Sequence, residues 1–230
     1  MLKTKTRTEK NRRADNEDSF VCIKAKMDGS DVGVFAVADG VGGLDKGEEA
    51  SRIAAENVDY WFRNVYPFKA QDTLEMLTSL SDVFNKSHKD IRRYGKDNGI
   101  NTATTLTVGL VSDGGLVVFH AGDASVYLVR DGKADKVTKV DYRKQIGKTG
   151  KMALTNCLGT AIDKFSIDRE IVETLQNGDR IFVATDGLVD RIDGSDIAEN
   201  DLDGLFEIAV REGRKDNMTG IQIDITGLGE

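Results

Sequence analysis

The sequence predicts a single domain of the α+β class, built around antiparallel sheets. Segments that look like strands and helices occur in blocks rather than in regular βαβ alternation, which argues against a doubly wound parallel sheet. The chain has 230 residues, of which 39% are hydrophobic, and one proline, so it can form a sizeable core and has no proline-rich linker. It shows no internal repeat and no low-complexity tract. We therefore expect one domain over residues 1–230.

The N-terminal segment is expected to be a basic arm followed by a β-hairpin. The first thirteen residues carry six Lys or Arg and one Glu, and no apolar stretch follows them, so residues 1–12 are interpreted as a charged arm and not as a signal peptide. The runs Ser19–Lys26 and Asp31–Ala38 are rich in apolar residues and flank the turn signal Asp28-Gly29-Ser30. This pattern predicts two paired strands.

Two amphipathic helices are predicted next. From Asp45 to Val65 apolar residues recur with the helical period, and Asp45 and Glu48 have the spacing of a capping box. A second apolar stripe runs from Leu74 to near Gly95. His88 lies on that stripe with no acidic residue or second histidine on its face. We expect it to be a packed core residue rather than a metal ligand.

The second half of the chain is expected to be mostly strands. The first three predicted strands are separated by short Gly- and Asp-containing turns, which indicates an antiparallel meander. Residues 139–152 are polar and lack a usable period, so they are expected to form a loop, while residues 202–210 have a helical period. The strands are predicted over Thr102–Val111, Leu116–Ala121, Ser125–Arg130, Ile167–Leu175, Arg180–Thr185 and Ile221–Ile225.

Charge and composition exclude several classes of protein. The formal net charge is −7, and it is more negative without the basic arm, so binding to nucleic acid is not expected. No apolar stretch approaches the ~18 residues of a membrane span. Cys22 and Cys157 are far apart and form no CxxC pair, so they are interpreted as core thiols in a reducing compartment, here the cytoplasm. With only two histidines, any metal must be held by oxygen.

Four aspartates fall where predicted strands end or begin, three of them beside glycine: Asp39, Asp123, Asp186 and Asp216. Taken singly, each is typical of an ordinary turn. Together, with no Lys or Arg placed to pair with each, they predict a shared site for a hard divalent cation such as Mg²⁺ or Mn²⁺. Such cations suit phosphate chemistry. The nearby glycine cluster, residues 40–43, matches neither nucleotide-binding loop pattern, so a nucleotide is not expected there.

A series of short motifs extends from Arg13 to Ile225. In chain order they read RADNED, FAVADGVGG, TATT, HAGDASVYLVRDG, LTNCLG, GDRIFVATDGLVD and DNMT. In this order they resemble the motifs of the PP2C-type (PPM) metal-dependent serine/threonine protein phosphatases, particularly the bacterial members. The resemblance implies a β-sandwich of two antiparallel sheets flanked by helix pairs, a four-layer αββα arrangement with a two-metal centre at one edge.

The resemblance also implies a ligand set for the two metals. Asp39 would bridge them, and Asp186 and Asp216 would hold one of the pair. Glu17 and the carbonyl of Gly40 would serve the other, partly through water.

Four further residues receive roles from the same motifs. Asp18 would lie adjacent to the metals and belong to their ligand set. Arg13 would bind the phosphate, because its planar guanidinium suits two phosphate oxygens. Asp123 matches the ligand of a third, weaker metal, and Asn217 would support the ligands from behind.

The implied function is hydrolysis of phosphoserine and phosphothreonine in proteins by a metal-activated water, opposing a protein kinase. Two cations about 3.5–4 Å apart lower the pKa of a shared water and neutralise charge on the phosphoryl group. Because a protein nucleophile is then unnecessary, Ser19 and Ser51 are interpreted as structural. We expect a cytoplasmic monomer that uses two Mn²⁺ or Mg²⁺ ions, or three. Its partners would be a phosphorylated protein and a cognate serine/threonine kinase, and neither nucleic acid nor a membrane.

Two other functions stay open: a catalytically inactive binding module of the same fold, and a metal phosphoesterase of small phosphorylated molecules. The presence of Asp39, Asp186 and Asp216 favours activity over the inactive module. The small-molecule alternative rests on Tyr142–Ala153, which is shorter than the flap expected in this family and lacks its helical apolar pattern.

Two further departures concern single positions. Val41 stands where some members carry a histidine that acts as general acid, so the proton donor for the leaving group is unassigned. Ala124-Ser125 replace the usual small residue and arginine after Asp123.

Overall fold

The computed structural model describes residues 1–139, 143–146, 151–160 and 165–227. Its strands are β1 (Leu2–Glu9), β2 (Asp18–Met27), β3 (Ser30–Asp39), β4 (Leu106–Ser112), β5 (Gly115–Ala121), β6 (Ser125–Arg130), β7 (Lys133–Lys136), β8 (Arg143–Ile146), β9 (Lys151–Leu154), β10 (Asp168–Val172), β11 (Arg180–Ala184) and β12 (Met218–Ile225). Its helices are α1 (Gly47–Asn64), α2 (Tyr66–Lys69), α3 (Thr73–Asn98), α4 (Asp186–Val189), α5 (Gly194–Glu199) and α6 (Leu202–Arg211).

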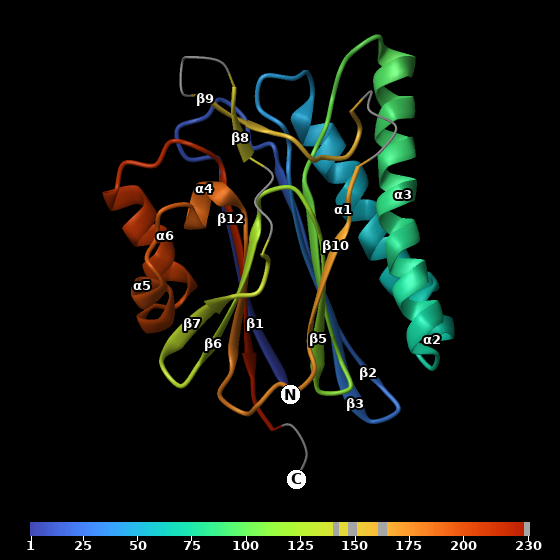
Figure 1. The fold of residues 1–230 in the computed structure, drawn as a ribbon, viewed down its shortest axis with the longest axis vertical. Coiled ribbons are helices and arrows are strands. Elements are labelled where there is room, and N and C mark those ends of the chain that lie inside the picture. The colour runs from blue at the N-terminus through green and yellow to red at the C-terminus, as the bar shows by residue number, and fades with distance from the viewer. Residues whose placement is uncertain (140–142, 147–150, 161–164, 228–230) are drawn as a thin grey trace.

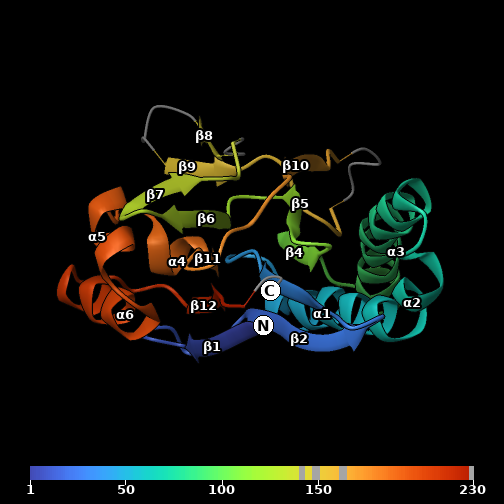
Figure 2. The ribbon, with the colours of Figure 1, turned by 90° about the horizontal axis from the view of Figure 1, so that it is seen from below.

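Two five-stranded antiparallel sheets face each other, and helices cover the outer face of each (Figures 1 and 2). The first sheet has the order β1–β12–β11–β6–β7 and the second β10–β5–β4–β3–β2, while β8 and β9 form a separate hairpin. α1 and α3 pack on the second sheet and α4 and α6 on the first. The predicted α+β sandwich with four layers is therefore confirmed.

Three apolar cores hold these layers together. Between the sheets, Phe35 of β3 packs with Val183 of β11 and Ile221 of β12, all with no exposed surface. Outside the second sheet, Trp61 and Phe84 carry the apolar faces of α1 and α3. The third core lies under α4 and α6 on the outer face of the first sheet. Because every sheet face is covered, the loops at the strand ends are held on a packed framework.

The predicted basic arm is wrong, because Leu2–Glu9 forms the edge strand β1. It pairs antiparallel with β12, from Leu2 opposite Ile225 to Glu9 opposite Met218. Two of its cationic side chains contact the α6 region: Lys5 Nζ lies 2.9 Å from Asp201 Oδ2, and the Arg7 guanidinium lies 4.5 Å from the centre of the Phe206 ring. Leu2 is the only apolar residue of the strand, so hydrophobic alternation could not reveal it.

The predicted three-strand meander is also wrong. β4 pairs with β5, but β6 pairs with β11 and β7 in the opposite sheet. Gly122 and Asp123 are therefore the point at which the chain crosses between sheets. Gly122 adopts φ +132°, and a Cβ on it would lie 2.5 Å from Cβ of Thr105, so a close backbone approach requires glycine there.

Smaller corrections concern element ends. α1 begins at Gly47, after Lys46 in the left-handed region, and no side chain caps it, so the capping box predicted for Asp45 and Glu48 does not form. The predicted loop of residues 139–152 contains the strands β8 and part of β9, while its residues 140–142 and 147–150 lie outside the described part of the chain.

Other expectations hold. His88 is buried, stacks on Phe165, and accepts a hydrogen bond from the Gly159 N–H at Nδ1, as expected for a packed core residue. Both cysteines are free; Cys157 is buried, but Cys22 is only half-buried, so its interpretation as a core thiol is only partly right. Within the described residues, no helix is both long and apolar enough to cross a bilayer.

Candidate functional site

The predicted site residues gather at one end of the sandwich, the upper end in Figure 1. Asp39 ends β3 and lies opposite Asp18, which begins β2. Asp186 follows β11, and Asp216 precedes β12, which pairs antiparallel with β11. Since antiparallel partners begin and end at the same edge, strand ends far apart in sequence meet there.

A pocket of about 490 Å³ opens at this end. Seven of the predicted site residues line it, whereas Asp18 and Asn217 do not and contact the lining loops from behind. The lining residues are Arg13, Glu17, Asp39, Gly40, Val41, Gly42, Gly43, Leu44, Thr105, Asp123, Leu154, Cys157, Thr160, Asp186 and Asp216.

Asp39 is fixed through its backbone. Its N–H donates to Thr105 Oγ1 at 3.0 Å, and its carbonyl accepts from Thr104 Oγ1 at 2.8 Å and from the Thr105 N–H at 2.9 Å. Burial raises the pKa of the Asp39 carboxyl well above its ordinary value, and the neighbouring carboxylates, Asp18 first among them, raise it further. A carboxyl in these surroundings is stabilised in its charged form by a bound cation.

Gly40 allows three backbone segments to meet. Its N–H donates to the Glu17 carbonyl at 3.0 Å. A Cβ on Gly40 would lie 2.5 Å from the backbone of Gly47 and 2.8 Å from the Glu17 carbonyl oxygen, so no larger residue fits. Glycine at this position therefore holds Glu17 beside Asp39. The pKa of the Glu17 carboxyl is raised, first by burial and then by the charge of Glu48.

Asp18 is buried beneath the pocket. Its Oδ2 accepts a hydrogen bond from Thr185 Oγ1 at 3.0 Å, while its Oδ1 is buried with no hydrogen-bond partner among the described residues. The pKa of Asp18 is raised to about 7, chiefly by burial; hydrogen bonds with Thr219 and Thr185 oppose the rise, and the charges of Asp186 and Asp216 add to it. An unpaired buried carboxylate oxygen is costly unless an ion or water occupies the space before it.

Asn217 joins the N-terminal loop to the start of β12. Its Oδ1 accepts from the Glu17 N–H at 2.9 Å, and its Nδ2 donates to the carbonyls of Lys10 at 3.0 Å and Asp15 at 2.9 Å. On its other side, a Cβ added to Gly187 would lie 1.8 Å from the Asn217 carbonyl oxygen. The amide of Asn217 therefore positions the loop that carries Arg13 and Glu17.

Arg13 is the one cationic side chain among the described residues that line the pocket. Its Nη2 donates to Asp216 Oδ2 at 2.7 Å. This hydrogen bond raises the pKa of Arg13, so the guanidinium stays charged at any physiological pH. A Cβ on Gly42 would lie 3.8 Å from both terminal nitrogens of Arg13, so the glycine segment leaves the guanidinium uncovered on that side.

The donor set fits hard divalent cations. These ions prefer carboxylate and carbonyl oxygens, which are the groups that Asp39, Asp186, Asp216, Glu17 and Gly40 present. Among the described residues, no three His, Cys, Asp or Glu side chains lie close enough together to hold a metal ion by themselves. Water would therefore complete the coordination of an ion bound here, as Mg²⁺ in particular requires.

Sequence reasoning gave no role to four threonines around the site: Thr104, Thr105, Thr185 and Thr219. The first two hold Asp39, as described above. Thr185 donates to Asp18, and its own Oγ1 accepts from the Thr219 N–H at 3.0 Å. The available signal was position: Thr104 and Thr105 directly precede β4, Thr185 lies between β11 and Asp186, and Thr219 is the second residue of β12, three after Asp216.

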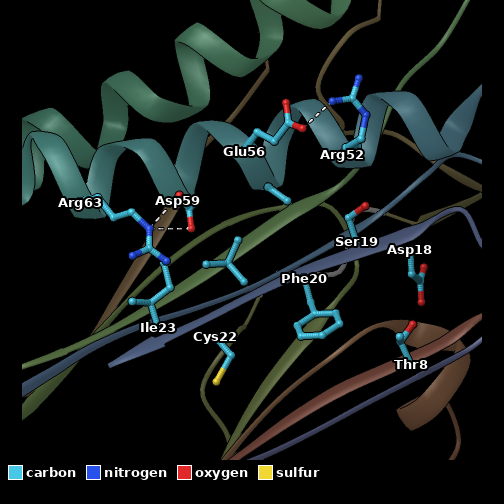
Figure 3. Close-up of a pocket in the computed structure, with 12 residues that line it drawn as sticks. Thr8, Asp18, Ser19, Phe20, Cys22, Ile23, Arg52, Glu56, Asp59 and Arg63 are labelled. Carbon is cyan, nitrogen blue, oxygen red and sulfur yellow. Dashed lines mark hydrogen bonds and ion pairs between the residues drawn. The ribbon is translucent and has the colours of Figure 1, made fainter. Parts of the chain in front are cut away.

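A larger groove of about 560 Å³ lies between α1 and β2 (Figure 3). Its two cations are paired: Arg52 pairs with Glu56 at 2.5 Å, and Arg63 pairs with Asp59 at 3.0 Å. The remaining charged side chain of the lining is Asp18, so the groove offers no free cation to a phosphate and only one unpaired carboxylate to a metal. The carboxylate pocket is the better candidate for a catalytic site.

Comparisons with known proteins identify one family. A profile of the family described as protein phosphatase 2C matches residues 8–221. The serine/threonine protein phosphatase PstP of Mycobacterium tuberculosis is 28% identical over 238 residues, covering 93% of this chain and 43% of that protein, so the chain spans under half of that relative's length.

Solved structures show the same fold. The S. agalactiae serine/threonine phosphatase superimposes with a TM-score of 0.84 at 22% identity, covering 98% of this chain and 100% of that one. The catalytic domain of PstP in complex with 2 manganese ions gives a TM-score of 0.78 at 24% identity, covering 98% and 99% of the two chains.

Proposed function

The chain belongs to the protein phosphatase 2C family, and from this premise we propose that it hydrolyses phosphoserine and phosphothreonine in proteins. The observation that carries the proposal is a pocket that combines several carboxylates with one arginine at the strand ends of the sandwich. Carboxylates can hold the cations that such chemistry needs, and the arginine can bind a phosphate oxygen pair. PstP, the relative named above, is a serine/threonine protein phosphatase.

The same proposal assigns the metal ligands. Asp39 would contact both of two Mn²⁺ or Mg²⁺ ions, Asp186 and Asp216 would serve one, and Glu17 with the Gly40 carbonyl would serve the other. When bound, such ions supply an activated water near neutral pH and neutralise negative charge on the phosphoryl group. The PstP catalytic domain was solved with manganese, which supports the choice of metal.

Two further positions complete the ligand proposal. Asp123 would hold a third ion, since it lines the same pocket at the crossover between the sheets. Asp18 would act next to the ions, because its buried Oδ1 has no partner among the described residues.

Arg13 would bind and orient the phosphate. Its bond to Asp216 fixes the guanidinium at the pocket wall, and its remaining N–H groups can reach two oxygens of a phosphate. Attack by water, without a phosphoenzyme, is supported by the position of the two nearby serines: Ser19 and Ser51 do not line the pocket, and their Oγ atoms lie 3.0 Å from each other. Their interpretation as structural residues agrees with this contact.

The proposal also covers the physiological setting. The substrate would be a phosphorylated protein, opposed by a cognate serine/threonine kinase, and the enzyme would act as a cytoplasmic monomer. The net charge of −7 supports the exclusion of nucleic acid as a partner.

The proposal is tested by comparing substrates. Phosphate release is measured from a phosphothreonine peptide, a phosphoserine peptide and a set of phosphorylated metabolites, each in Mn²⁺. We expect both peptides to be hydrolysed with a higher kcat/KM than any metabolite. Preference for a metabolite would support the small-molecule phosphoesterase instead, and hydrolysis of none would support the inactive binding module.

A further inference from the structure

A second groove adjoins the candidate pocket; its charged lining residues are basic, whereas those of the pocket are mostly acidic. It has a volume of about 390 Å³ and shares Leu44 and Thr160 with the pocket, so the two hollows meet along one rim. We call it the α3 groove. It is lined by Leu44, Arg92, Gly95, Lys96, Ile100, Asn101, Thr102, Gly159 and Thr160.

The α3 groove is basic on an acidic protein. Arg92 and Lys96 lie one turn apart on α3, and none of the nine lining residues is acidic, although the whole chain has a net charge of −7. Lys96 makes no ion pair with any part of the chain that the structure describes. Asp45, which follows Leu44, has an exposed side chain that is not part of the lining. Lys96 therefore offers a positive charge without a paired carboxylate among the described residues, next to a pocket that is rich in carboxylates.

Its walls are built of tightly packed backbone. A Cβ on Gly159 would lie 2.3 Å from the Ile91 side chain and 2.8 Å from the Thr102 carbonyl, and one on Gly95 would lie 2.9 Å from the Ile100 carbonyl. The rim is fixed by the Asp45 N–H, which donates to the Asn101 carbonyl at 2.9 Å. A groove with these constraints is largely preformed, so little ordering is needed when a ligand binds.

We propose that the α3 groove binds the residues that flank the phosphorylated side chain of a protein substrate, and that it selects an acidic residue there. The inference rests on the proposed function. With the phosphate at Arg13, an extended peptide advances about 3.3 Å per residue, so a few residues carry it over the shared rim at Leu44 into the groove. There a substrate carboxylate meets Lys96, while Leu44, which is 38% exposed, contacts the aliphatic part of the peptide.

The test uses phosphothreonine peptides that share one core sequence. A single glutamate is moved from four residues before to four residues after the phosphothreonine, against an all-alanine reference. The proteins compared are the wild type, Lys96→Glu, and Lys89→Glu as the control, since Lys89 is exposed on the same helix and does not line the groove. A chromogenic aryl phosphate serves as a probe that fills the candidate pocket but is too small to reach the groove.

We expect the wild type to prefer glutamate at one or two positions, with kcat/KM roughly three- to tenfold above the alanine reference. Lys96→Glu should abolish or reverse that preference by raising KM for the glutamate peptides. Lys89→Glu should retain the preference. Both variants should hydrolyse the aryl phosphate like the wild type. A wild type without any positional preference, or a preference unchanged in Lys96→Glu, overturns the assignment of the groove while the phosphatase function stands. Lack of activity on every substrate contradicts the proposed function and the groove assignment with it.

Discussion

Replacing Asn217 by alanine should weaken both the fold and the site. The substitution removes the three hydrogen bonds that the amide makes to Glu17, Lys10 and Asp15. At about 0.5–1.5 kcal/mol for each bond, the loss is about 3 kcal/mol, and the side chain is only 4% exposed, so water replaces the lost partners poorly. For a domain of this size, that loss lowers Tm by about 6–12 °C.

The effect on catalysis follows from the same contacts. Without the amide, the loop that carries Arg13 and Glu17 is no longer held against the start of β12, so KM for a phosphopeptide should rise more than the change in Tm alone explains. The assay is thermal unfolding together with kinetics well below Tm. The matched control is Asn64→Ala, since that amide donates only to Tyr60 O on the exposed side of α1.

Free energies of unfolding within about 1 kcal/mol of each other for Asn217→Ala and Asn64→Ala would contradict the stabilising role of the Asn217 amide. Its role in the site is refuted if Asn217→Ala loses stability but retains wild-type KM and kcat, because the amide would then be structural alone.

Three further predictions follow from other contacts. Asp39→Asn should leave the circular dichroism spectrum unchanged but abolish turnover, since it weakens the oxygen donor shared by both proposed ions; more than a few per cent of the wild-type rate would contradict this. Arg13→Ala should lower kcat/KM for phosphopeptides about 10- to 100-fold, whereas Arg12→Ala, its neighbour outside the pocket, should change little, and equal kinetics for the two would remove Arg13 from the site. Asp179→Asn should cost about 2–3 kcal/mol at pH 7, because the buried carboxylate accepts from Arg130 at 2.6 and 2.8 Å and from the Gln176 N–H. Burial alone would raise the pKa of Asp179, but these bonds lower it. The stabilisation by the Asp179 carboxylate is therefore present above the unfolded pKa of about 3.9 and is lost as pH falls through the lower folded pKa. Urea unfolding should show a stability difference between wild type and Asp179→Asn that shrinks below pH 4, and a difference that stays constant with pH would contradict this.

The shared site of the strand-end aspartates could be predicted because the sequence pattern that marks each of them lies within a few residues. A buried apolar run that stops at Asp-Gly marks a strand end, and Asp39 and Asp186 show this pattern within a few residues. Antiparallel pairing then brings such ends to one edge. The same local logic identified the two long helices, whose apolar period extends over many turns.

The features that the sequence did not predict depend on contacts between distant segments. β1 lacks apolar alternation, and its pairing with β12 joins residues more than 200 positions apart. The turn signal at Gly122-Asp123 looks the same whether the next strand pairs with β5 or crosses to the opposite sheet. The hydrogen bond from Thr185 to Asp18 likewise links residues 167 positions apart, and no local sequence pattern at either residue predicts it.

The central claim is that the carboxylate pocket is a metal-dependent centre for phosphoprotein hydrolysis. It is tested most directly by phosphate release from a phosphothreonine peptide by one preparation, measured in EDTA and again after excess Mn²⁺ is restored. We predict that EDTA abolishes the activity and that Mn²⁺ restores it in the wild type. Equal hydrolysis with and without EDTA would contradict the claim, as would a failure of Mn²⁺ to produce any activity.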